Sequence, residues 1–255
     1  MTALLTLQNA TRRFGGLDAV DDVSFSVAAG EVLGLIGPNG AGKTTMINLI
    51  TGVHPATGGR VLFDGRDITH LKPYRIAGLG LARTFQIVQP FPRMSVLENV
   101  AAGALFAGHA AHMRDAEAQA REHLRFTGMI DIAEKPAATL TLAQRKRLEL
   151  AKSLAMKPRL LMLDEVNAGL NASEVDDALA MIRRIAERGV TIIVIEHLMK
   201  VVLSISQRIV VLHHGQLIAE GEPQSVLRDP SVIEAYLGPK YAAAMATGTI
   251  AGGPA

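Results

Sequence analysis

The stretch Gly37-Pro38-Asn39-Gly40-Ala41-Gly42-Lys43-Thr44 decides the fold of this chain. It matches the pattern G-x-x-x-x-G-K-[ST] at every fixed position, with an apolar strand expected at residues 31–36 and a helix at about residues 43–51. Glycines let backbone N–H groups wrap around phosphates, and the N-terminus of a helix adds partial positive charge there. The sequence therefore predicts a phosphate-binding loop, and we expect the following residues to bind a nucleotide: Gly37, Asn39, Gly40, Ala41, Gly42, Lys43, Thr44 and Thr45.

Two side chains of this loop and two later carboxylates carry the expected chemistry. Lys43 is expected to reach the β- and γ-phosphates, and the Thr44 hydroxyl to bind Mg²⁺. The apolar run at residues 160–163 ends in Asp164 and Glu165. Asp164 is then placed to hold Mg²⁺ or its water shell, and Glu165 to orient and deprotonate an attacking water. An Asp-Glu pair alone is more often a solvated strand end, but after a phosphate loop in the same sheet the odds reverse, and carboxylate, metal and water together make hydrolysis chemically possible.

The runs at residues 160–163 and 190–195 are typical of strands buried on both faces, as in a parallel sheet. Between them the pattern predicts a helix capped by Ser173, with Asp176 three residues on and Gly189 as its end. Strand, helix and strand then form a right-handed unit. Earlier in the chain, residues 58–65 predict a hairpin strand that is closed by the turn Asp64-Gly65.

The middle of the chain has a helical pattern. Ser95 and Glu98 form a capping box, after which Ala-rich sequence runs to about Phe126, and residues 145–154 predict another helix. We therefore expect a helical insertion, at about residues 88–157, between two halves of an α/β core. Residues 241–255 are rich in Ala, Gly and Thr without clear periodicity, and we expect a flexible C-terminal tail there.

Composition excludes several function classes. The chain has 255 residues, 26 basic against 24 acidic, and no cysteine, so it fits a large globular domain without disulfides, thiolate zinc sites or a cysteine nucleophile. No run approaches the roughly 20 apolar residues that span a bilayer, and residues 1–12 lack the pattern of a signal peptide. The histidine pairs at 109 and 112 and at 213 and 214 have no cysteine or nearby acidic partner, so we expect no metal site at either.

Taken together, the motifs resemble those of the ATP-binding subunit of an ABC transporter, over about residues 4–238. The resemblance implies an α/β fold of the P-loop NTPase type, with a RecA-like core, an antiparallel β subdomain and a helical subdomain, forming one domain over residues 1–240. It also implies roles for four more residues. Phe14 stacks on adenine, and Gln86 binds metal and water and faces the transmembrane subunits. His197 contacts the γ-phosphate, and Asn171 lies in the loop that crosses a dimer interface. Glu165, His197 and Gln86 are then the catalytic residues, and Thr44, Gln86 and Asp164 hold the metal.

A closer resemblance is to the ATPases of branched-chain amino acid importers. It rests on residues 78–86, on residues 94–100, on the Ala-rich insertion and on residues 232–238. Such importers carry two different ATPase subunits. The form Arg83-Thr84-Phe85-Gln86 resembles the subunit with the longer helical insertion.

The chain departs from the family at its signature. Where the family has Leu-Ser-Gly-Gly-Gln, or in this group Leu-Ser-Tyr-Gly-Gln, the chain has Leu140-Thr141-Leu142-Ala143-Gln144. Thr141 keeps the hydroxyl but adds a methyl group, and Ala143 places a Cβ close to a phosphate. If the site has no room or needs φ > 0, Ala143 weakens it by about 1 kcal/mol or more. Val166 also replaces the proline that usually follows the Asp-Glu pair.

In the family the signature acts on ATP that the other subunit holds. The resemblance therefore implies that Thr141, Ala143, Gln144 and Asn171 act in trans. We hypothesise an asymmetry: the nucleotide site of this chain is complete, whereas the site that it completes for its partner is impaired.

The resemblance implies an ATP-binding and ATP-hydrolysing subunit that powers an importer of branched-chain amino acids or a related small solute, with ATP and Mg²⁺ as cofactors. Its expected partners are a second ATP-binding subunit, expected to be a different chain, two transmembrane permease subunits and, indirectly, a solute-binding protein. Its expected location is the cytoplasmic face of the plasma membrane of a prokaryotic cell, as a peripheral protein.

Two alternatives stay open on the sequence. The altered signature permits a regulatory nucleotide binder that hydrolyses ATP weakly or not at all. An ABC ATPase that acts on nucleic acid or ribosomes is the other, but such proteins usually add long coiled coils or a second ATPase module, and this chain has neither. We therefore expect no nucleic-acid partner.

Overall fold

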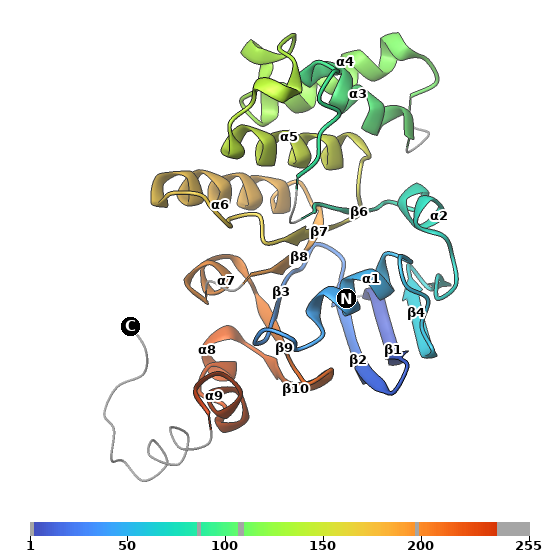
Figure 1. The fold of residues 1–255 in the computed structure, drawn as a ribbon, viewed down its shortest axis with the longest axis vertical. Coiled ribbons are helices and arrows are strands. Elements are labelled where there is room, and N and C mark those ends of the chain that lie inside the picture. Colours follow the sequence, from blue (N-terminus) through green and yellow to red (C-terminus); the bar gives the residue numbers. More distant parts are fainter. Residues whose placement is uncertain (1–2, 86–87, 107–109, 197–198, 239–255) are drawn as a thin grey trace.

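Two β-sheets and their covering helices make up the part of the chain that the computed structural model describes, residues 3–85, 88–106, 110–196 and 199–238 (Figure 1). The larger sheet has the strand order β10-β9-β3-β8-β7-β6, and its neighbouring strands are parallel except for β9 and β10. Its strands are β3 (Val32–Ile36), β6 (Leu81–Arg83), β7 (Leu160–Asp164), β8 (Thr191–Ile195), β9 (Arg208–His213) and β10 (Gln216–Gly221). Every residue of β3, β7 and β8 is buried, as expected for strands covered on both faces.

The smaller sheet is antiparallel and has the strand order β2-β1-β4-β5. Its strands are β1 (Ala3–Phe14), β2 (Leu17–Ala28), β4 (Gly58–Phe63) and β5 (Arg66–Asp67). Asp64 and Gly65 both have positive φ, 51° and 74°, as a two-residue hairpin turn with a right-handed strand twist requires. The expected hairpin is therefore confirmed.

Helix α1 (Lys43–Ile50) packs between the two sheets. Its buried residues Met46 and Ile47 belong to one apolar cluster with Leu33 of β3 and Phe63 of β4. Because the helix is held on both sides, the loop that links β3 to α1 has a fixed position. That loop is the predicted phosphate loop.

The opposite face of the larger sheet is covered by α6 (Ala172–Ala186), α7 (Met199–Ile205), α8 (Pro223–Val226) and α9 (Pro230–Leu237). The predicted cap of α6 was wrong. Asn171, not Ser173, caps the helix: its side chain accepts a hydrogen bond from the Glu174 N–H at 3.0 Å, and Glu174 accepts one from the Asn171 N–H at 2.9 Å. Asn caps a helix as well as Ser does, and a capping box needs the longer Glu side chain, which Asp176 lacks.

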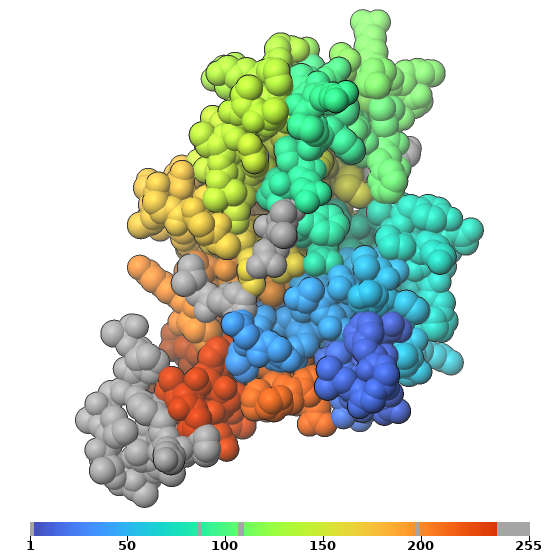
Figure 2. Space-filling model, viewed as in Figure 1, coloured from blue at the N-terminus to red at the C-terminus, as the bar shows by residue number. Residues whose placement is uncertain are grey.

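The remaining helices are α2 (Pro73–Gly78), α3 (Val96–Phe106), α4 (Met113–Phe126), α5 (Leu142–Ala155) and the short 3₁₀ turns η1 (Ile130–Ile132) and η2 (Ala137–Thr139). Helices α3, α4 and α5 share a separate apolar core and stand as a lobe above the sheets (Figure 2). The capping box of Ser95 and Glu98 is confirmed, with bonds of 2.7 and 3.1 Å. The Ala-rich run forms two helices rather than one, and α5 begins at Leu142, three residues before its expected start.

The architecture confirms the predicted fold class: an α/β core, an antiparallel sheet and a helical lobe. The limits of 1–240 for the domain and 88–157 for its helical part stay predictions. The expected tail at residues 241–255 lies outside the described residues. Within the described ranges, no helix has the length and apolar character needed to cross a membrane.

Candidate functional site

The phosphate loop has the backbone that its glycines predict. Gly40 and Gly42 have positive φ, 79° and 99°, and a Cβ on Gly42 would lie 2.4 Å from the carbonyl oxygen of Ala19. Gly42 is also the N-cap residue of α1 and has no side chain to satisfy the first amide groups of the helix. These N–H groups and the positive end of the helix dipole therefore face the loop, where an anion is favoured.

Lys43 lies at the centre of the loop and is 7% exposed. Its Nζ donates hydrogen bonds to the carbonyl oxygens of Gly37, at 2.6 Å, and Pro38, at 3.0 Å. Burial lowers the pKa of Lys43, while the charges of Glu165 and Asp164 act to raise it. A buried ammonium group held over a loop of backbone N–H groups is suited to bind the phosphates of a nucleotide.

A cavity of about 350 Å³ brings the predicted elements together. Its wall includes residues 39–45 of the phosphate loop and both carboxylates, Asp164 and Glu165. Residues 17–19 of β2, Ile195 of β8 and the turn at His214 and Gly215 complete the wall, and no motif predicts them there. These residues belong to no motif, so their sequence does not indicate a place in the cavity. Residues 17–19, His214 and Gly215 lie there because the antiparallel sheet and the β9–β10 turn pack against the phosphate loop.

Phe14, the expected adenine contact, is absent from the described lining of this cavity. The ring is 39% exposed, lies edge-on to His54 at 5.3 Å, and is covered by the Arg12 guanidinium at 4.4 Å. The wall beside it is formed by Leu17 and Asp18 instead. The stacking role of Phe14 stays a prediction.

Asp164 ends β7 and is 6% exposed. Its Oδ2 accepts a hydrogen bond at 2.8 Å from Arg83 of β6, which also donates to Asn48 of α1 at 2.7 Å. The Asp164 N–H donates to the Thr84 hydroxyl at 3.2 Å. A buried pair of this kind is costly unless its partners are fixed, and here both ends are fixed to the strands and to α1. Arg83 is therefore a site residue. In the sequence it belongs to the form Arg83-Thr84-Phe85-Gln86, which did not indicate this contact with Asp164.

The oxygen atoms in this cavity fit a hard divalent cation. Mg²⁺ takes hydroxyl, carboxylate, water and phosphate oxygens rather than a full cage of protein ligands. Thr44 and Asp164 both line the cavity, with Glu165 beside them. The described residues contain no cluster of three or more metal-ligating side chains, so a cation here needs oxygens from the nucleotide and water.

Glu165 follows Asp164 in a left-handed backbone conformation, with φ of 48°. Such a conformation costs a non-glycine residue about 1–3 kcal/mol and persists only where the surroundings enforce it. The Glu165 N–H donates to the Ile195 carbonyl at 2.9 Å, and its carbonyl accepts from the Ala168 N–H at 3.2 Å and from Lys146 Nζ at 3.0 Å. Strand β8, helix α5 and the loop itself thus fix the backbone of the expected catalytic carboxylate.

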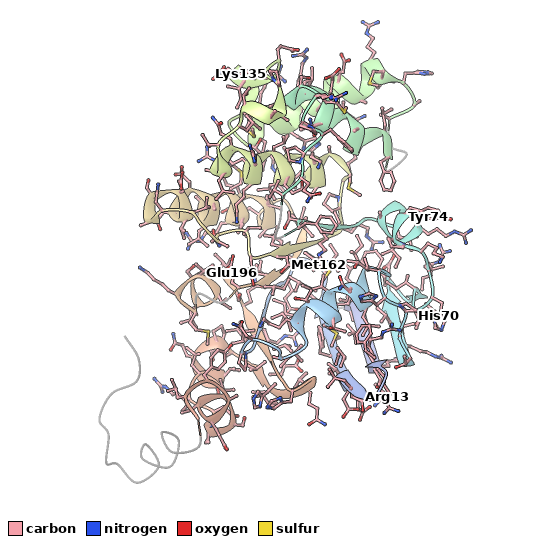
Figure 3. All side chains as sticks on the ribbon, in the orientation of Figure 1. Arg13, His70, Tyr74, Lys135, Met162 and Glu196 are labelled. Atoms are coloured by element: carbon pink, nitrogen blue, oxygen red, sulfur yellow. The ribbon has the colours of Figure 1, made fainter. Side chains whose placement is uncertain are left out.

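Glu196 extends this fixed region at the end of β8 (Figure 3). It is 3% exposed and accepts hydrogen bonds from the backbone N–H of Asn167 at 3.0 Å and from its side-chain amide at 2.9 Å. Burial raises the pKa of Glu196, while these bonds and the charge of Lys146 act to lower it. No motif in the sequence singles out Glu196, because only its burial in the folded chain marks it.

The residues expected to act in trans lie outside the lining of the phosphate cavity. Thr141 is the N-cap of α5, and its hydroxyl accepts a hydrogen bond from the Gln144 N–H at 3.3 Å, while the Gln144 side chain accepts one from the Thr141 N–H at 3.0 Å. Ala143 lies in the first turn of α5 and is not among the described residues with positive φ, so its backbone carries no strain of that kind. Gln86 and His197 lie outside the described residues.

A second, apolar cavity of about 460 Å³ lies between α2, α3 and α5. Four aromatic side chains on its wall are 53–60% exposed, and we call them the aromatic groove: Tyr74, Phe85, Phe91 and Phe106. Arg83 also lines this cavity, with its guanidinium 5.0 Å from the centre of the Phe85 ring. Exposed apolar surface of this kind marks interaction sites more often than chance.

Comparison with known proteins identifies relatives over nearly the whole chain. Residues 20–168 match the family described as ABC transporter, and residues 216–238 match the one described as branched-chain amino acid ATP-binding cassette transporter. The high-affinity branched-chain amino acid transport ATP-binding protein BraF of Pseudomonas aeruginosa is 41% identical over 249 residues, covering 92% of this chain and 98% of BraF. LivG of Escherichia coli K12, with the same description, is 38% identical over 251 residues, covering 92% and 98%.

Solved structures agree with these relatives. A nucleotide-free ATP-binding cassette from an ABC transporter superposes with a TM-score of 0.85 at 33% identity, covering 93% of this chain and all of that one. An ATP-binding cassette of an ABC transporter in its ADP conformation gives the same TM-score and identity, covering 94% and 100%.

Proposed function

The chain belongs to the family of ABC transporter ATP-binding proteins, and we propose that it binds and hydrolyses ATP to power an importer of branched-chain amino acids or a related small solute. The observation that carries this proposal is the single cavity in which the phosphate loop, Lys43, Asp164 and Glu165 meet. None of the relatives described above is named as a regulatory nucleotide binder, and the alternative of a non-hydrolysing protein has no support from them.

Each residue of the cavity then has a task. The amide groups of the loop and Lys43 bind the phosphates, with Lys43 exchanging its bonds to loop carbonyls for bonds to phosphate oxygens. Thr44 and Asp164 hold Mg²⁺, which neutralises charge on the phosphate oxygens when bound. Glu165 accepts a proton from the attacking water. His197 and Gln86 complete the site in this proposal.

The partner assignments follow the same logic. The N-terminus of α5 and the cap of α6 contact a second ATP-binding subunit. The following residues then lie against the ATP that the second subunit holds: Thr141, Ala143, Gln144 and Asn171. The aromatic groove receives an apolar helix of a permease subunit, because four half-exposed aromatic rings surround one cavity. The chain then works as a peripheral protein at the cytoplasmic face of a prokaryotic plasma membrane.

The test is the Glu165→Gln variant in the transporter complex isolated from membranes. If Glu165 is the base, ATP hydrolysis should fall at least about 100-fold while ATP binding is retained. Glu134→Gln is the control, because Glu134 is a highly exposed carboxylate paired only with Arg121 in the described structure. An unaffected Glu165→Gln variant would contradict the proposed mechanism. Competition uptake assays on the same complex then identify the solute.

A further inference from the structure

A polar contact ties the signature helix α5 to the catalytic loop. Lys146 Nζ donates a hydrogen bond at 3.0 Å to the backbone carbonyl of Glu165, not to its carboxylate. Lys146 is half-buried, and burial lowers its pKa, with Glu196 and Glu165 acting to raise it. A half-buried ammonium group is costly to hold unless hydrogen bonds and opposite charges compensate, and here the Glu165 carbonyl and the charges of Glu196 and Glu165 do so.

The residue at the other end of this contact is held unusually. Glu165 has a left-handed backbone, and its carbonyl is shared by Lys146 and the Ala168 N–H. On the far side, the Glu165 N–H is bonded to the end of β8. Among the contacts that hold the Glu165 backbone, one therefore comes from the sheet and one from α5.

The next residue makes the α5 anchor more important. Val166 lacks the ring with which a proline would fix φ, so the backbone after Glu165 has more freedom than a proline would allow. Asn167 is held by Glu196, again on the sheet side. Within the described structure, Lys146 is the polar side chain that links this loop to the helical lobe, and Leu142 of α5 also approaches the loop at Gly169.

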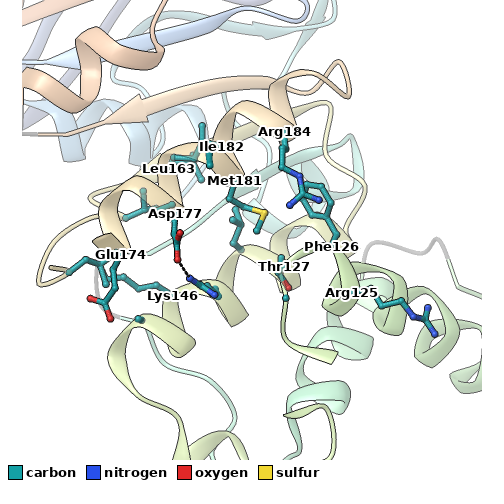
Figure 4. Close-up of a pocket in the computed structure, with 18 residues that line it drawn as sticks. Arg125, Phe126, Thr127, Lys146, Leu163, Glu174, Asp177, Met181, Ile182 and Arg184 are labelled. Carbon is teal, nitrogen blue, oxygen red and sulfur yellow. Dashed lines mark hydrogen bonds and ion pairs between the residues drawn. The ribbon is translucent and has the colours of Figure 1, made fainter. Parts of the chain in front are cut away.

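A cavity lies beside Lys146, between α5 and α6. This cavity of about 340 Å³ separates α5 from α6, and Figure 4 shows Lys146, Asp177 and Met181 on its wall. The contact across its rim is the ion pair of Arg147 and Asp177 at 2.7 Å, in which both side chains are exposed. An exposed ion pair contributes little, so the half-buried Lys146 contact is the firmer of these two polar contacts. Apolar packing of Leu154 against Leu161 and Leu163 of β7 also holds α5 on the sheet.

We propose that Lys146 is a positioning residue: it transmits the position of the signature helix α5 to the catalytic carboxylate of Glu165 through the backbone of Glu165. When a partner's nucleotide engages the N-terminus of α5, the helix shifts, and Lys146 carries that shift to the loop. The inference rests on the proposed role of Glu165 as the base.

The experiment compares three variants of the full chain in the transporter complex. Lys146→Met nearly keeps the side-chain length and removes the donor, so kcat for ATP hydrolysis should fall about tenfold while KM for ATP stays within about twofold. Lys146→Arg keeps a donor and should recover most of kcat. Arg147→Met removes a charge from the same helix without a contact to Glu165, and should stay close to the wild-type kcat.

A double variant, Lys146→Met with Glu165→Gln, distinguishes failure of the positioning role from failure of the proposed function. If both hold, Glu165→Gln removes most hydrolysis, and adding Lys146→Met causes no further loss. Wild-type hydrolysis in Glu165→Gln alone would overturn the proposed function. If Glu165→Gln blocks hydrolysis but Lys146→Met behaves like Arg147→Met, the positioning role is wrong and the proposed function stands. An equal loss of ATP binding and kcat in Lys146→Met would also overturn the positioning role, since that pattern indicates a structural role.

Discussion

Replacing Ala143 by glycine should make the protein less stable and the transporter faster. Ala143 lies in the first turn of α5, with helical backbone and a methyl group on the wall of the cavity between α5 and α6. Glycine in a helix costs about 0.5–1 kcal/mol relative to alanine, and removal of a partly buried methyl adds a fraction of about 0.8 kcal/mol. The sum is about 1 kcal/mol, which lowers Tm by about 2–4 °C for a domain of this size.

The effect on turnover has the opposite sign. If the Cβ of Ala143 stands where the partner's phosphate approaches, its removal recovers about 1 kcal/mol in the transition state. A difference of 1.36 kcal/mol is tenfold in rate, so ATP turnover of the complex should rise about fivefold. Adding Thr141→Ser should increase the gain, because serine keeps the hydroxyl that caps α5.

The assay pairs thermal unfolding of the chain with ATP hydrolysis by the complex. Ala118→Gly is the matched control, because Ala118 is an exposed alanine in the middle of α4. It should lower Tm by a similar amount and leave turnover unchanged. If Ala143→Gly lowers Tm but turnover stays at the wild-type value, the signature is not impaired by its alanine, and the hypothesis of asymmetry is refuted.

Three further outcomes test other parts of the structure. Gly42→Ala should destabilise the chain by about 2 kcal/mol more than Gly40→Ala, because both carry left-handed strain but only a Cβ on Gly42 meets a backbone oxygen, at 2.4 Å; chemical denaturation measures the difference. Burial raises the pKa of Glu196 above its usual 4.5, so the native state binds this proton more tightly than the unfolded state does. The wild type therefore loses stability as pH rises from about 4.5 through the raised pKa. Glu196→Gln should therefore gain stability relative to the wild type as pH rises above about 4.5, and an unchanged difference would contradict the burial argument. Phe106→Ser should weaken co-purification with the permease while nucleotide binding by the isolated chain stays the same, and unchanged assembly would exclude this ring from the interface.

The parts of the site that are contiguous in sequence could be predicted. The loop around Lys43 and the pair Asp164 and Glu165 carry their chemistry in a short pattern, and the buried strands before them place that pattern at one edge of a parallel sheet. The same holds for the Asp64-Gly65 turn, where local backbone preference decides. Long-range packing was needed only to bring the two patterns to one cavity.

The parts that other elements contribute could not be predicted. Arg83 contacts Asp164 because β6 pairs with β7, and Lys146 contacts Glu165 because α5 packs beside the end of β7. The form Arg83-Thr84-Phe85-Gln86 contains Arg83 but says nothing of its contact with Asp164, and no motif singles out Lys146, so both roles depend on tertiary contacts. The cap of α6 was missed for a different reason, since Asn171 and Ser173 both suit a cap and only the reach of the N3 side chain separates them.

The two departures from the family pattern meet in the fold. Ala143 in α5 and Val166 after β7 both line the cavity between α5 and α6, although the sequence offers no link between them. Lys146 joins α5 to the backbone of Glu165, and the two departures lie at the two ends of this contact. Ala143 adds a methyl group at the start of α5, and Val166 lacks the ring with which a proline would fix φ after Glu165. Neighbouring changes that share a cavity are not additive. The gain in ATP turnover from Ala143→Gly is therefore measured in a chain whose loop after Glu165 has valine in place of proline. The size of the effect at either position depends on the residue at the other.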